Sequence, residues 1–507
     1  MRYYYFGLSA PCITCSCLIF VILLCGCQKK KSMLVWNEDF PVIGSQSSPR
    51  TSDLNGDGVL DIVMGAGMNE YQHSEKGVLA LDGKTGKLLW QQEASDQVYG
   101  SATFYDITND GVTDVFIGGR SPHFKALDGK TGKLIWEYKY ADHEKDSILK
   151  NARFNFNNSV LVPDVNNDGL MDLLTVNGGN SYANPYSEIE RFPGVLMIFD
   201  IKSGSIIAAD TMPDGKESYM SPLYFSQPGS KEHSIVFGTG GETIDGNLFI
   251  ASLSNLLNKE LSKSRVIASD KGHGFIAPPS MADINGDGFL DIVAITHGSK
   301  VFAIDGQNYD FLWQQSIANT ECSNSLAVGY FTEDDIPDFF TFASKGQWPN
   351  STGSMQVMLD GSNGSIAFVD SIGCTGFSSP VVYDIDADGR DEAIISVNEF
   401  DCSVGFTGNA PVTIENKLIA VDFQTKSYKI IDQAVGFKNI FSTPWIGDLD
   451  DDGYLDVVHC QYYHRSMLLS FLGMRVKRID TPIRMRSTPI WGAYMSSAGD
   501  GIFKRTD

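Results

Sequence analysis

The chain of 507 residues carries 62 acidic and 39 basic side chains, which gives a formal net charge of −23. Its 42% hydrophobic and 11% aromatic content excludes a disordered chain. The strong acidity argues against a phosphate-binding surface, so nucleic acid is not an expected partner. The 50 glycines, together with the aromatic residues, favour β structure with many turns.

The N-terminal segment has the features of an export signal. Arg2 is followed by an apolar run at residues 18–24, which is too short to cross a bilayer and ends just before a small residue and a cysteine. This pattern predicts a cleaved signal peptide over residues 1–26. An uncleaved anchor helix is the alternative interpretation.

The four residues Leu24-Cys-Gly-Cys27 resemble the lipobox of bacterial lipoproteins. The resemblance implies cleavage before Cys27, lipidation of its thiol and a lipidated tether over residues 27–32. Cys25 is the weaker candidate, because Leu24 would then occupy the small-residue position. The expected location is the bacterial cell envelope, as an outer-membrane lipoprotein that is periplasmic or surface-exposed and contacts the membrane through its lipid.

One sequence pattern recurs through the remainder of the chain. A Ser-Pro-like start leads into D-x-N-x-D-G-x-x-D, and an apolar run follows at once. A later strand ends in Asp-Gly, and a Thr-Gly-Lys turn then leads into a strand that ends in Trp, most clearly at residues 78–90 and 124–136. The eight units start near residues 53, 106, 164, 226, 283, 330, 384 and 448.

Each unit holds four short apolar runs separated by Gly, Asn and Asp, which is typical of antiparallel meanders. The repeats therefore predict an all-β fold, a single β-propeller over residues 33–507 with eight four-stranded blades, and seven blades as the alternative count. Residues 33–36 look like a fourth strand without its unit, and residues 487–490 like a first strand without its continuation. These two segments either meet and close the ring or form extra edge strands.

The acidic loops carry the most specific chemistry in the sequence. Oxygen-bearing side chains occupy positions 1, 3, 5 and 9, and a residue at position 6, usually glycine, permits a sharp reversal. Such a set suits Ca²⁺ better than Mg²⁺, because calcium accepts six or more oxygen ligands at a flexible radius. Six intact copies predict about six structural Ca²⁺ sites, and the alternative is a plain Asp-Asn-Gly turn that caps a hairpin. The predicted ligands are Asp53, Asn55, Asp57, Asp61, Asp106, Thr108, Asp110, Asp114, Asp164, Asn166, Asp168, Asp172, Asp283, Asn285, Asp287, Asp291, Asp384, Asp386, Asp388, Glu392, Asp448, Asp450, Asp452 and Asp456.

These loops resemble the FG-GAP/VCBS repeats of integrin-α-type propellers, and the strands around Ala-Leu-Asp-Gly-x-Thr-Gly-Lys-x-x-Trp resemble the PQQ-type propeller repeat. Together the resemblances cover about residues 33–500 and imply a calcium-laced propeller, but no single activity. The predicted strands that follow the loops disfavour EF-hand and dockerin modules. The copy at Tyr330 (residues 330–338) lacks its first acid and its glycine, which puts metal binding there in question. The copy at Ser226 is expected to bind no metal.

Meander topology separates two faces of the predicted ring. The calcium loops and the Asp-Gly-Lys-Thr-Gly turns share one regular face, and the long irregular segments share the other, where function is expected. The irregular face is predicted to bind a protein or glycan ligand. Ordinary solvated loop residues are the alternative interpretation of each candidate. The candidates are His73, Arg120, His123, His143, Arg153, His273, His297, Trp348, His464 and Arg465.

Four cysteines lie in the predicted propeller, and export permits disulfides among them. They are Cys322, Cys374, Cys402 and Cys460, and their three pairings are equally compatible with the sequence.

Three classes of function are compatible with these features. The first is a lipid-anchored binding module, and the second is an enzyme similar to the eight-bladed polysaccharide lyases. Quinoprotein dehydrogenases share the Trp-containing repeat, but their adjacent Cys-Cys pair and any haem motif are absent from the sequence. The third class is a scaffold resembling the lipoprotein propeller of outer-membrane assembly. The sequence contains no nucleophile elbow, H-E-x-x-H, P-loop or G-x-G-x-x-G motif, which favours the binding module.

Overall fold

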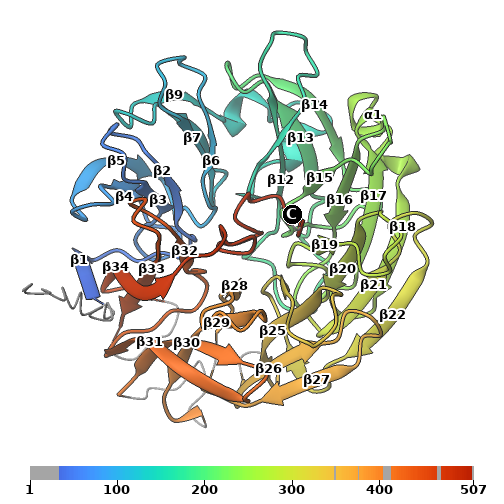
Figure 1. Ribbon diagram of the computed structural model, residues 1–507. Coiled ribbons are helices and arrows are strands. Elements are labelled where there is room, and N and C mark those ends of the chain that lie inside the picture. The colour runs from blue at the N-terminus through green and yellow to red at the C-terminus, as the bar shows by residue number, and fades with distance from the viewer. Residues whose placement is uncertain (1–32, 348–349, 375, 403–412, 465–469, 505–507) are drawn as a thin grey trace, which may run out of the picture.

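The computed structural model describes residues 33–347, 350–374, 376–402, 413–464 and 470–504 (Figure 1). Within these residues, eight antiparallel sheets are arranged in a ring, so the predicted propeller with eight four-stranded blades is confirmed. The predicted signal peptide, Cys27, the tether, Trp348 and Arg465 lie outside the described residues. No helix in the described part of the chain is long and apolar enough to cross a membrane.

The first four blades follow chain order, and in each one the first strand is the innermost. Blade 1 contains β2 (Arg50–Ser52), β3 (Asp61–Gly65), β4 (Ser74–Leu81) and β5 (Leu88–Ala94). Blade 2 contains β6 (Thr103–Tyr105), β7 (Asp114–Gly118), β8 (Phe124–Leu127) and β9 (Leu134–Glu137). Blade 3 contains β11 (Val160–Val162), β12 (Asp172–Gly178), β13 (Val195–Phe199) and β14 (Ile206–Thr211), with the short β10 (Asn155–Phe156) also pairing with β12. Blade 4 contains β15 (Leu223–Phe225), β16 (Ser234–Gly238), β17 (Gly246–Ser252) and β18 (Arg265–Asp270).

The other four blades complete the ring. Blade 5 contains β19 (Ser280–Ala282), β20 (Asp291–Ile295), β21 (Lys300–Ile304) and β22 (Phe311–Ser316). Blade 6 contains β24 (Ala327–Gly329), β25 (Asp338–Lys345), β26 (Gly353–Leu359) and β27 (Ile366–Asp370), with β23 (Thr320–Glu321) also pairing with β25. Blade 7 contains β28 (Val381–Tyr383), β29 (Glu392–Glu399), β30 (Glu415–Asp422) and β31 (Ser427–Val435). Blade 8 contains β32 (Trp445–Gly447), β33 (Tyr454–Tyr463), β34 (Gly473–Arg484) and β1 (Met33–Pro41). The short helices are η1 (Tyr140–Asp142), η2 (Leu149–Asn151), α1 (Leu253–Leu257) and η3 (Leu261–Lys263).

Burial along the strands reflects their place in the ring. The second strands β3, β7 and β20 are buried at every position, because neighbouring blades cover both of their faces. The outermost strand β27 buries only Phe368. The hydrophobic core therefore lies between blades, and it is divided among several clusters instead of forming one central mass.

The ring closes in blade 8, where the N-terminal strand joins the C-terminal ones. Strand β1 pairs antiparallel with β34 and forms the outer edge of this sheet, so the predicted strand at residues 33–36 is the fourth strand of blade 8 and closes the ring with residues 473–484 instead of residues 487–490. Residues 487–490, in contrast, form bends and a turn, so their assignment as a first strand is wrong. The chain leaves the sheet after β34 and enters the central channel, where it bonds to strands of other blades (Figure 1).

The C-terminal segment 485–504 closes the central channel. It bonds through its backbone to the innermost strands of three blades, and the buried Arg50 guanidinium of a fourth donates to the carbonyls of Tyr494 and Ser496. The backbone contacts are Val382 N to Trp491 O (2.9 Å), Ile446 N to Gly492 O (2.8 Å) and Met281 N to Gly501 O (2.8 Å). The C-terminal segment thus occupies the central channel.

The Ser-Pro-like start of each repeat joins neighbouring blades. The N–H of Ser325 donates to Ser379 Oγ (3.1 Å), and the N–H of Ser379 donates to Thr443 Oγ1 (3.0 Å). The N–H of Thr443 in turn donates to Ser48 Oγ (3.0 Å), which carries the chain of hydrogen bonds across the closure of the ring. These residues are buried around the channel, so their hydroxyls satisfy backbone donors that water does not reach.

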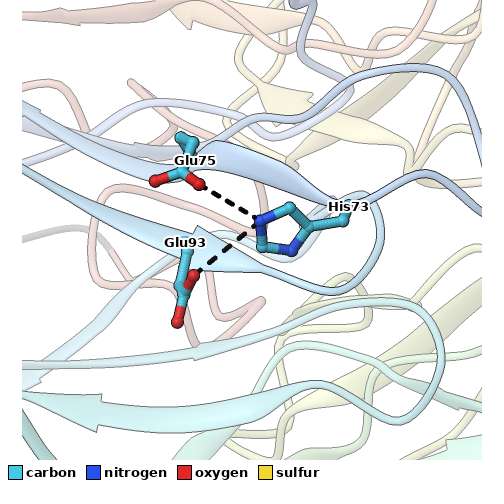
Figure 2. Close-up of side chains that lie close together, drawn as sticks. All are labelled: His73, Glu75 and Glu93. Atoms are coloured by element: carbon cyan, nitrogen blue, oxygen red, sulfur yellow. Dashed lines mark hydrogen bonds and ion pairs between the residues drawn. The ribbon is translucent and has the colours of Figure 1, made fainter.

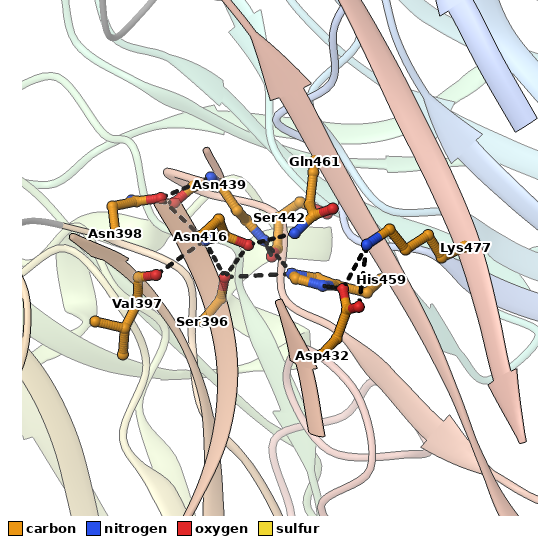
Figure 3. A network of polar contacts seen from close by, with 10 residues as sticks. All are labelled: Ser396, Val397, Asn398, Asn416, Asp432, Asn439, Ser442, His459, Gln461 and Lys477. Atoms are coloured by element: carbon orange, nitrogen blue, oxygen red, sulfur yellow. Dashed lines mark hydrogen bonds and ion pairs between the residues drawn. The ribbon is translucent and has the colours of Figure 1, made fainter. Parts of the chain in front are cut away.

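Blades 7 and 8 also share a buried polar network, drawn in Figure 3. Asp432 contacts His459 Nδ1 (3.4 Å) and Lys477 Nζ (2.8 Å). Burial opposes ionisation of Asp432, but its contacts with His459 and Lys477 outweigh this effect and hold the pKa of the carboxyl below its usual range. On the other side of the His459 imidazole, Nε2 lies 3.2 Å from Ser396 Oγ. The network joins two blades and does not line the cavities described below.

Among the described residues there is one disulfide, between Cys374 and Cys402, with a sequence separation of 28 residues. Cys322 and Cys460 are buried free thiols. The structure therefore contains one bridge that export permitted, and none of the three two-bridge pairings is complete.

Candidate functional site

The regular face carries the six predicted metal loops, each of which directly follows the first strand of its blade or comes one residue later. In blade 1, the carboxylate of Asp53 accepts the N–H groups of Gly56 (2.7 Å) and Gly58 (3.0 Å). The side chains of Asn55 and Asp57 accept N–H groups two residues further along. The loop is therefore folded around its own acidic side chains.

The acid at position 9 connects three pieces of structure. Asp61 is fully buried and accepts the N–H of Leu54 (2.9 Å) in its own loop and that of Gly83 (3.0 Å) in the Asp-Gly turn. Burial raises the pKa of Asp61 to about 6, although the hydrogen bonds from these N–H groups oppose the shift. Trp36 Nε1 of the neighbouring blade donates to the carbonyl of Gly83 (2.8 Å). The same arrangement recurs with Asp114, Gly129 and Trp90, and with Asp338, Gly361 and Trp313.

Two loops bring three carboxylates within 4.8 Å of one another. These are Asp384, Asp386 and Glu392 in blade 7, and Asp448, Asp450 and Asp456 in blade 8. Burial, reinforced by Asp386 and Asp384, raises the pKa of Glu392 to about 8. In the blade 7 loop, a divalent cation would relieve this repulsion, and its all-oxygen donor set fits Ca²⁺.

The blade 3 loop fits a cation on a different observation. Asp172 is fully buried, and its Oδ1 has no hydrogen-bond partner. Burial raises its pKa, and the nearby carboxylates of Asp200, Asp168 and Asp164 add to the shift. A buried carboxylate oxygen left open among other acids is suited to a cation, because a cation would supply the missing positive charge.

The blade 8 loop already contains a positive group. The guanidinium of Arg478, which is 3% exposed, donates to Asp456 (3.0 Å) and to Asp450 (2.5 Å). Its Nη1 also donates to the carbonyl of Gly83 in blade 1 (3.2 Å). Arg478 therefore offsets part of the negative charge of this loop and links it across the closure of the ring. The demand for a bound cation is smaller here than in blade 7.

The irregular face contains a central cavity of about 690 Å³. Side chains from the 2–3 loops and the inter-blade links form its walls, and Tyr494 of the C-terminal segment contributes from within the channel. The aromatic lining consists of Tyr99, Tyr186, Tyr219, Phe377, Phe441 and Tyr494. The amide lining consists of Asn155, Asn157, Asn158 and Asn180.

The charged side chains of the cavity wall are mostly paired within the protein. Arg120 donates to Glu70 (2.5 Å), and Arg191 donates to the buried Glu217. His297 Nε2 lies 3.5 Å from Glu321 Oε2. The wall is therefore polar, with little excess charge of either sign.

Three hydrogen-bonding groups of the wall are buried and have no hydrogen-bond partner within the described residues. They are Asn157 Nδ2, Arg120 Nε and His297 Nε2. Asn157 Nδ2 and Arg120 Nε are hydrogen-bond donors in every ionisation state, and His297 Nε2 is a donor in one tautomer of the neutral imidazole. Buried polar groups without partners are costly, which makes them indicators of a ligand that supplies acceptors.

The structure brings only some of the predicted ligand-face residues together. Arg120 and His297 line the central cavity. His73 and His123 line a separate cavity of about 370 Å³ between blades 1 and 2. His73 is exposed and lies near Glu75 and Glu93 (3.5 and 3.8 Å), as Figure 2 shows.

His123, in contrast, is buried, and burial lowers its pKa to about 3. The remaining candidates have local contacts. Arg153 lies over the Phe192 ring (3.9 Å), and His273 Nδ1 contacts the carbonyl of Glu242 (2.8 Å). The ring of His143 stacks on Tyr138, and burial lowers the pKa of His464.

Most of the cavity wall was missed by reasoning from sequence, which selected histidine, arginine and tryptophan in loops. The tyrosines and asparagines of the wall come from links next to the first strands. One signal was present: blade 3 has Asn157-Asn158-Ser159 where other repeats have a Ser-Pro-like start. Tyr494 could not be placed, because its segment leaves the repeat pattern.

The fold and the cavity define the chain as an eight-bladed propeller with a closed channel and a ligand-sized well at one mouth. Residues 46–223, about a third of the chain, match the family described as "Outer membrane protein assembly factor BamB". No curated protein matches the sequence.

Several solved structures have a similar fold. A europium-containing methanol dehydrogenase is 12% identical with a TM-score of 0.56, covering 89% of this chain and 93% of its own. A quinohemoprotein alcohol dehydrogenase from Pseudomonas putida HK5 is 9% identical with a TM-score of 0.55, covering 90% of this chain and 77% of its own. BamB from Moraxella catarrhalis is 11% identical with a TM-score of 0.46, covering 88% of this chain and 99% of its own. At these identities the likeness to the two dehydrogenases shows the fold alone.

Proposed function

We propose that the protein is a binding module that takes a carbohydrate in its central cavity. The observation that carries this proposal is the composition of the wall, in which six aromatic side chains and four asparagines line about 690 Å³ of space. Aromatic rings pack against the apolar faces of sugar rings, and amides donate to and accept from sugar hydroxyls. A cavity of this size suits a small molecule or a short oligosaccharide better than a folded partner.

The charge balance of the wall favours a largely uncharged sugar. Arg120 and Arg191 are each held by a carboxylate of the protein, so they are less available to neutralise an anionic ligand. Asn157 Nδ2 and Arg120 Nε remain as buried donors without partners. Sugar hydroxyl and ring oxygens are acceptors that match such donors.

A pair of tyrosines in one loop provides the test. Tyr186 lines the cavity and is 72% exposed, whereas Tyr182 is 67% exposed and stacks on Tyr71 outside it (ring centroids 4.2 Å). We expect a glycan array to identify a ligand and calorimetry to show at least about fivefold weaker binding for Tyr186→Ala, since stacking contributes about 1 kcal/mol or more. Tyr182→Ala should bind like the native protein. Equal effects of the two changes, or no glycan ligand on the array, would contradict the proposal.

The setting of this module is a second part of the proposal. The lipobox-like N-terminus supports export and lipid anchoring at Cys27 in the cell envelope. The oxygen-lined loops of blades 1, 2, 3, 5 and 7 support structural Ca²⁺ at the regular face, away from the cavity. Metabolic labelling with a palmitate analogue tests the anchor, with Cys27→Ser as the variant that should lose the label.

An assembly scaffold is the second candidate, because the matching family is described as an outer-membrane assembly factor. Such a scaffold would bind a protein instead of a sugar. Crosslinking in intact envelopes followed by mass spectrometry would favour the scaffold if a membrane-assembly protein is captured by the native protein and equally by Tyr186→Ala.

A further inference from the structure

A serine, a histidine and a glutamate lie next to one another in the cavity wall, and the binding proposal makes no use of them. Ser323 Oγ lies 3.0 Å from His297 Nδ1, and Glu321 Oε2 lies 3.5 Å from Nε2 of the same ring. All three residues line the central cavity. A histidine held between a hydroxyl and a carboxylate is the arrangement that activates serine as a nucleophile on several unrelated folds.

The protein holds the histidine firmly. The backbone N–H of His297 donates to the carbonyl of Gly274 (3.0 Å), and the backbone carbonyl of His297 accepts the N–H of Cys322 (2.9 Å). The side chains of His297 and Glu321 are 3% and 9% exposed, while Ser323 is half-buried. The base is therefore shielded and fixed, and the hydroxyl is the most open member of the three.

The two ring nitrogens have different environments. His297 Nε2 is buried without a hydrogen-bond partner and faces the carboxylate of Glu321. A proton on Nε2 is favoured there by the negative charge, which leaves Nδ1 as the acceptor for the Ser323 hydroxyl proton. The 3.5 Å separation from Glu321 is longer than a hydrogen bond, and catalytic contacts of this kind commonly shorten when substrate binds.

We infer that Ser323, His297 and Glu321 hydrolyse an O-acyl ester carried by the ligand of this cavity. Ser323 Oγ attacks the ester carbonyl carbon while His297 Nδ1 takes the hydroxyl proton. The bond between that carbon and the sugar oxygen breaks, and the departing oxygen takes the proton from His297. Water then attacks the acyl-serine carbonyl while the same nitrogen takes its proton. The bond between the carbonyl carbon and Ser323 Oγ breaks, Ser323 Oγ takes the proton back from His297, and the carboxylic acid is released. The sequence of steps needs neither an oxidant nor a metal.

Fluorophosphonate labelling tests the nucleophile without any knowledge of the glycan. The reagent forms a bond between phosphorus and the serine oxygen and releases fluoride, and intact-mass and peptide mass spectrometry locate the adduct. We expect one adduct, on Ser323, in the native lipid-free chain. Ser323→Ala should abolish it, and His297→Gln should slow it about 100-fold or more. Ser95→Ala, which changes an exposed serine of the other cavity, should leave the labelling rate unchanged.

Hydrolysis of p-nitrophenyl acetate and release of acetate from O-acetylated polysaccharides provide the second readout. Both activities should be lost in Ser323→Ala, whose melting curve should match that of the native protein because the side chain is small and half-buried. An adduct on another residue, or labelling that is insensitive to His297→Gln, would overturn the inference. The inference rests on the proposed function in one respect, namely that the alcohol released from the ester is a sugar. Glycan binding that persists without labelling defeats the esterase alone, and labelling without glycan binding defeats the carbohydrate proposal alone.

Discussion

The two faces of the propeller are built from the same strands but differ in how much they repeat. On the regular face, the position-9 acid, the turn glycine and the neighbouring tryptophan recur with closely similar distances in blades 1, 2 and 6. On the irregular face, each loop and link is different, and together they form the central cavity. The repeated contacts of the regular face thus stabilise the blades, and the varied loops and links of the irregular face form the candidate site on that rigid frame.

The strongest test of the regular face is removal of its proposed calcium. Excess chelator should lower the melting temperature by several degrees, because each site filled at 100 times its Kd stabilises the native state by about 2.7 kcal/mol. Differential scanning fluorimetry measures the shift, and added Ca²⁺ should restore it while Mg²⁺ should do so less well. A melting curve that does not respond to the chelator would mean that hydrogen bonds alone hold these loops.

Within the regular face, the closure of the ring should differ from the other blades. Arg478→Met removes the guanidinium between Asp450 and Asp456 and leaves a buried carboxylate uncompensated. Breaking a buried pair in this way costs about 3–5 kcal/mol, which urea denaturation in the presence of chelator would measure.

A matched control lies three residues earlier on the same strand. Arg475 pairs with the exposed Asp39, so Arg475→Met should cost no more than about 1 kcal/mol. If calcium restores the stability of Arg478→Met but not of Arg475→Met, the cation would be acting in the place of the guanidinium. Similar losses for the two variants would show that the blade 8 loop is not held by Arg478.

The repeated regular face could be predicted from the sequence, and most of the irregular face could not. Eight repeats with a recurring turn chemistry were sufficient to predict the blades, because every copy independently indicates the same strands. The chain after β34 has no repeat to follow, so its path into the channel was not predicted. The cavity wall depends on side chains such as Tyr99 and Asn157, which meet only when distant links converge. The pairing of Cys374 with Cys402 likewise depends on the approach of the link before blade 7 to the 2–3 loop of that blade.

The irregular face should also show a pH dependence of its own. Lys438 lies in the link before β32 and is 1% exposed, and burial lowers its pKa to about 7. Because an unfolded lysine titrates near 10.4, the unfolded state binds more protons between about pH 7 and 10, so stability rises with pH across that range. Lys438→Met should flatten this rise and stabilise the protein by up to about 4 kcal/mol at pH 7, since each unit of pKa difference corresponds to about 1.4 kcal/mol. Denaturation at several pH values checks it, and a slope that Lys438→Met leaves unchanged would assign the dependence to other groups.

The smallest expected effect is the loss of one tryptophan hydrogen bond on the regular face. Comparing this loss between two blades tests whether the repeated bond contributes equally to stability. Trp90→Phe retains a ring against Gly132 but removes the hydrogen bond from Nε1 to the carbonyl of Gly129 (2.7 Å), which should cost about 1 kcal/mol. Trp313→Phe removes the same bond to Gly361 (2.7 Å). If the repeats are equivalent, the two losses should agree within about 0.5 kcal/mol, and the double variant should show their sum, because the sites share no partner. Unequal losses would mean that the repeated hydrogen bonds are alike in geometry but differ in the stability that they contribute to each blade.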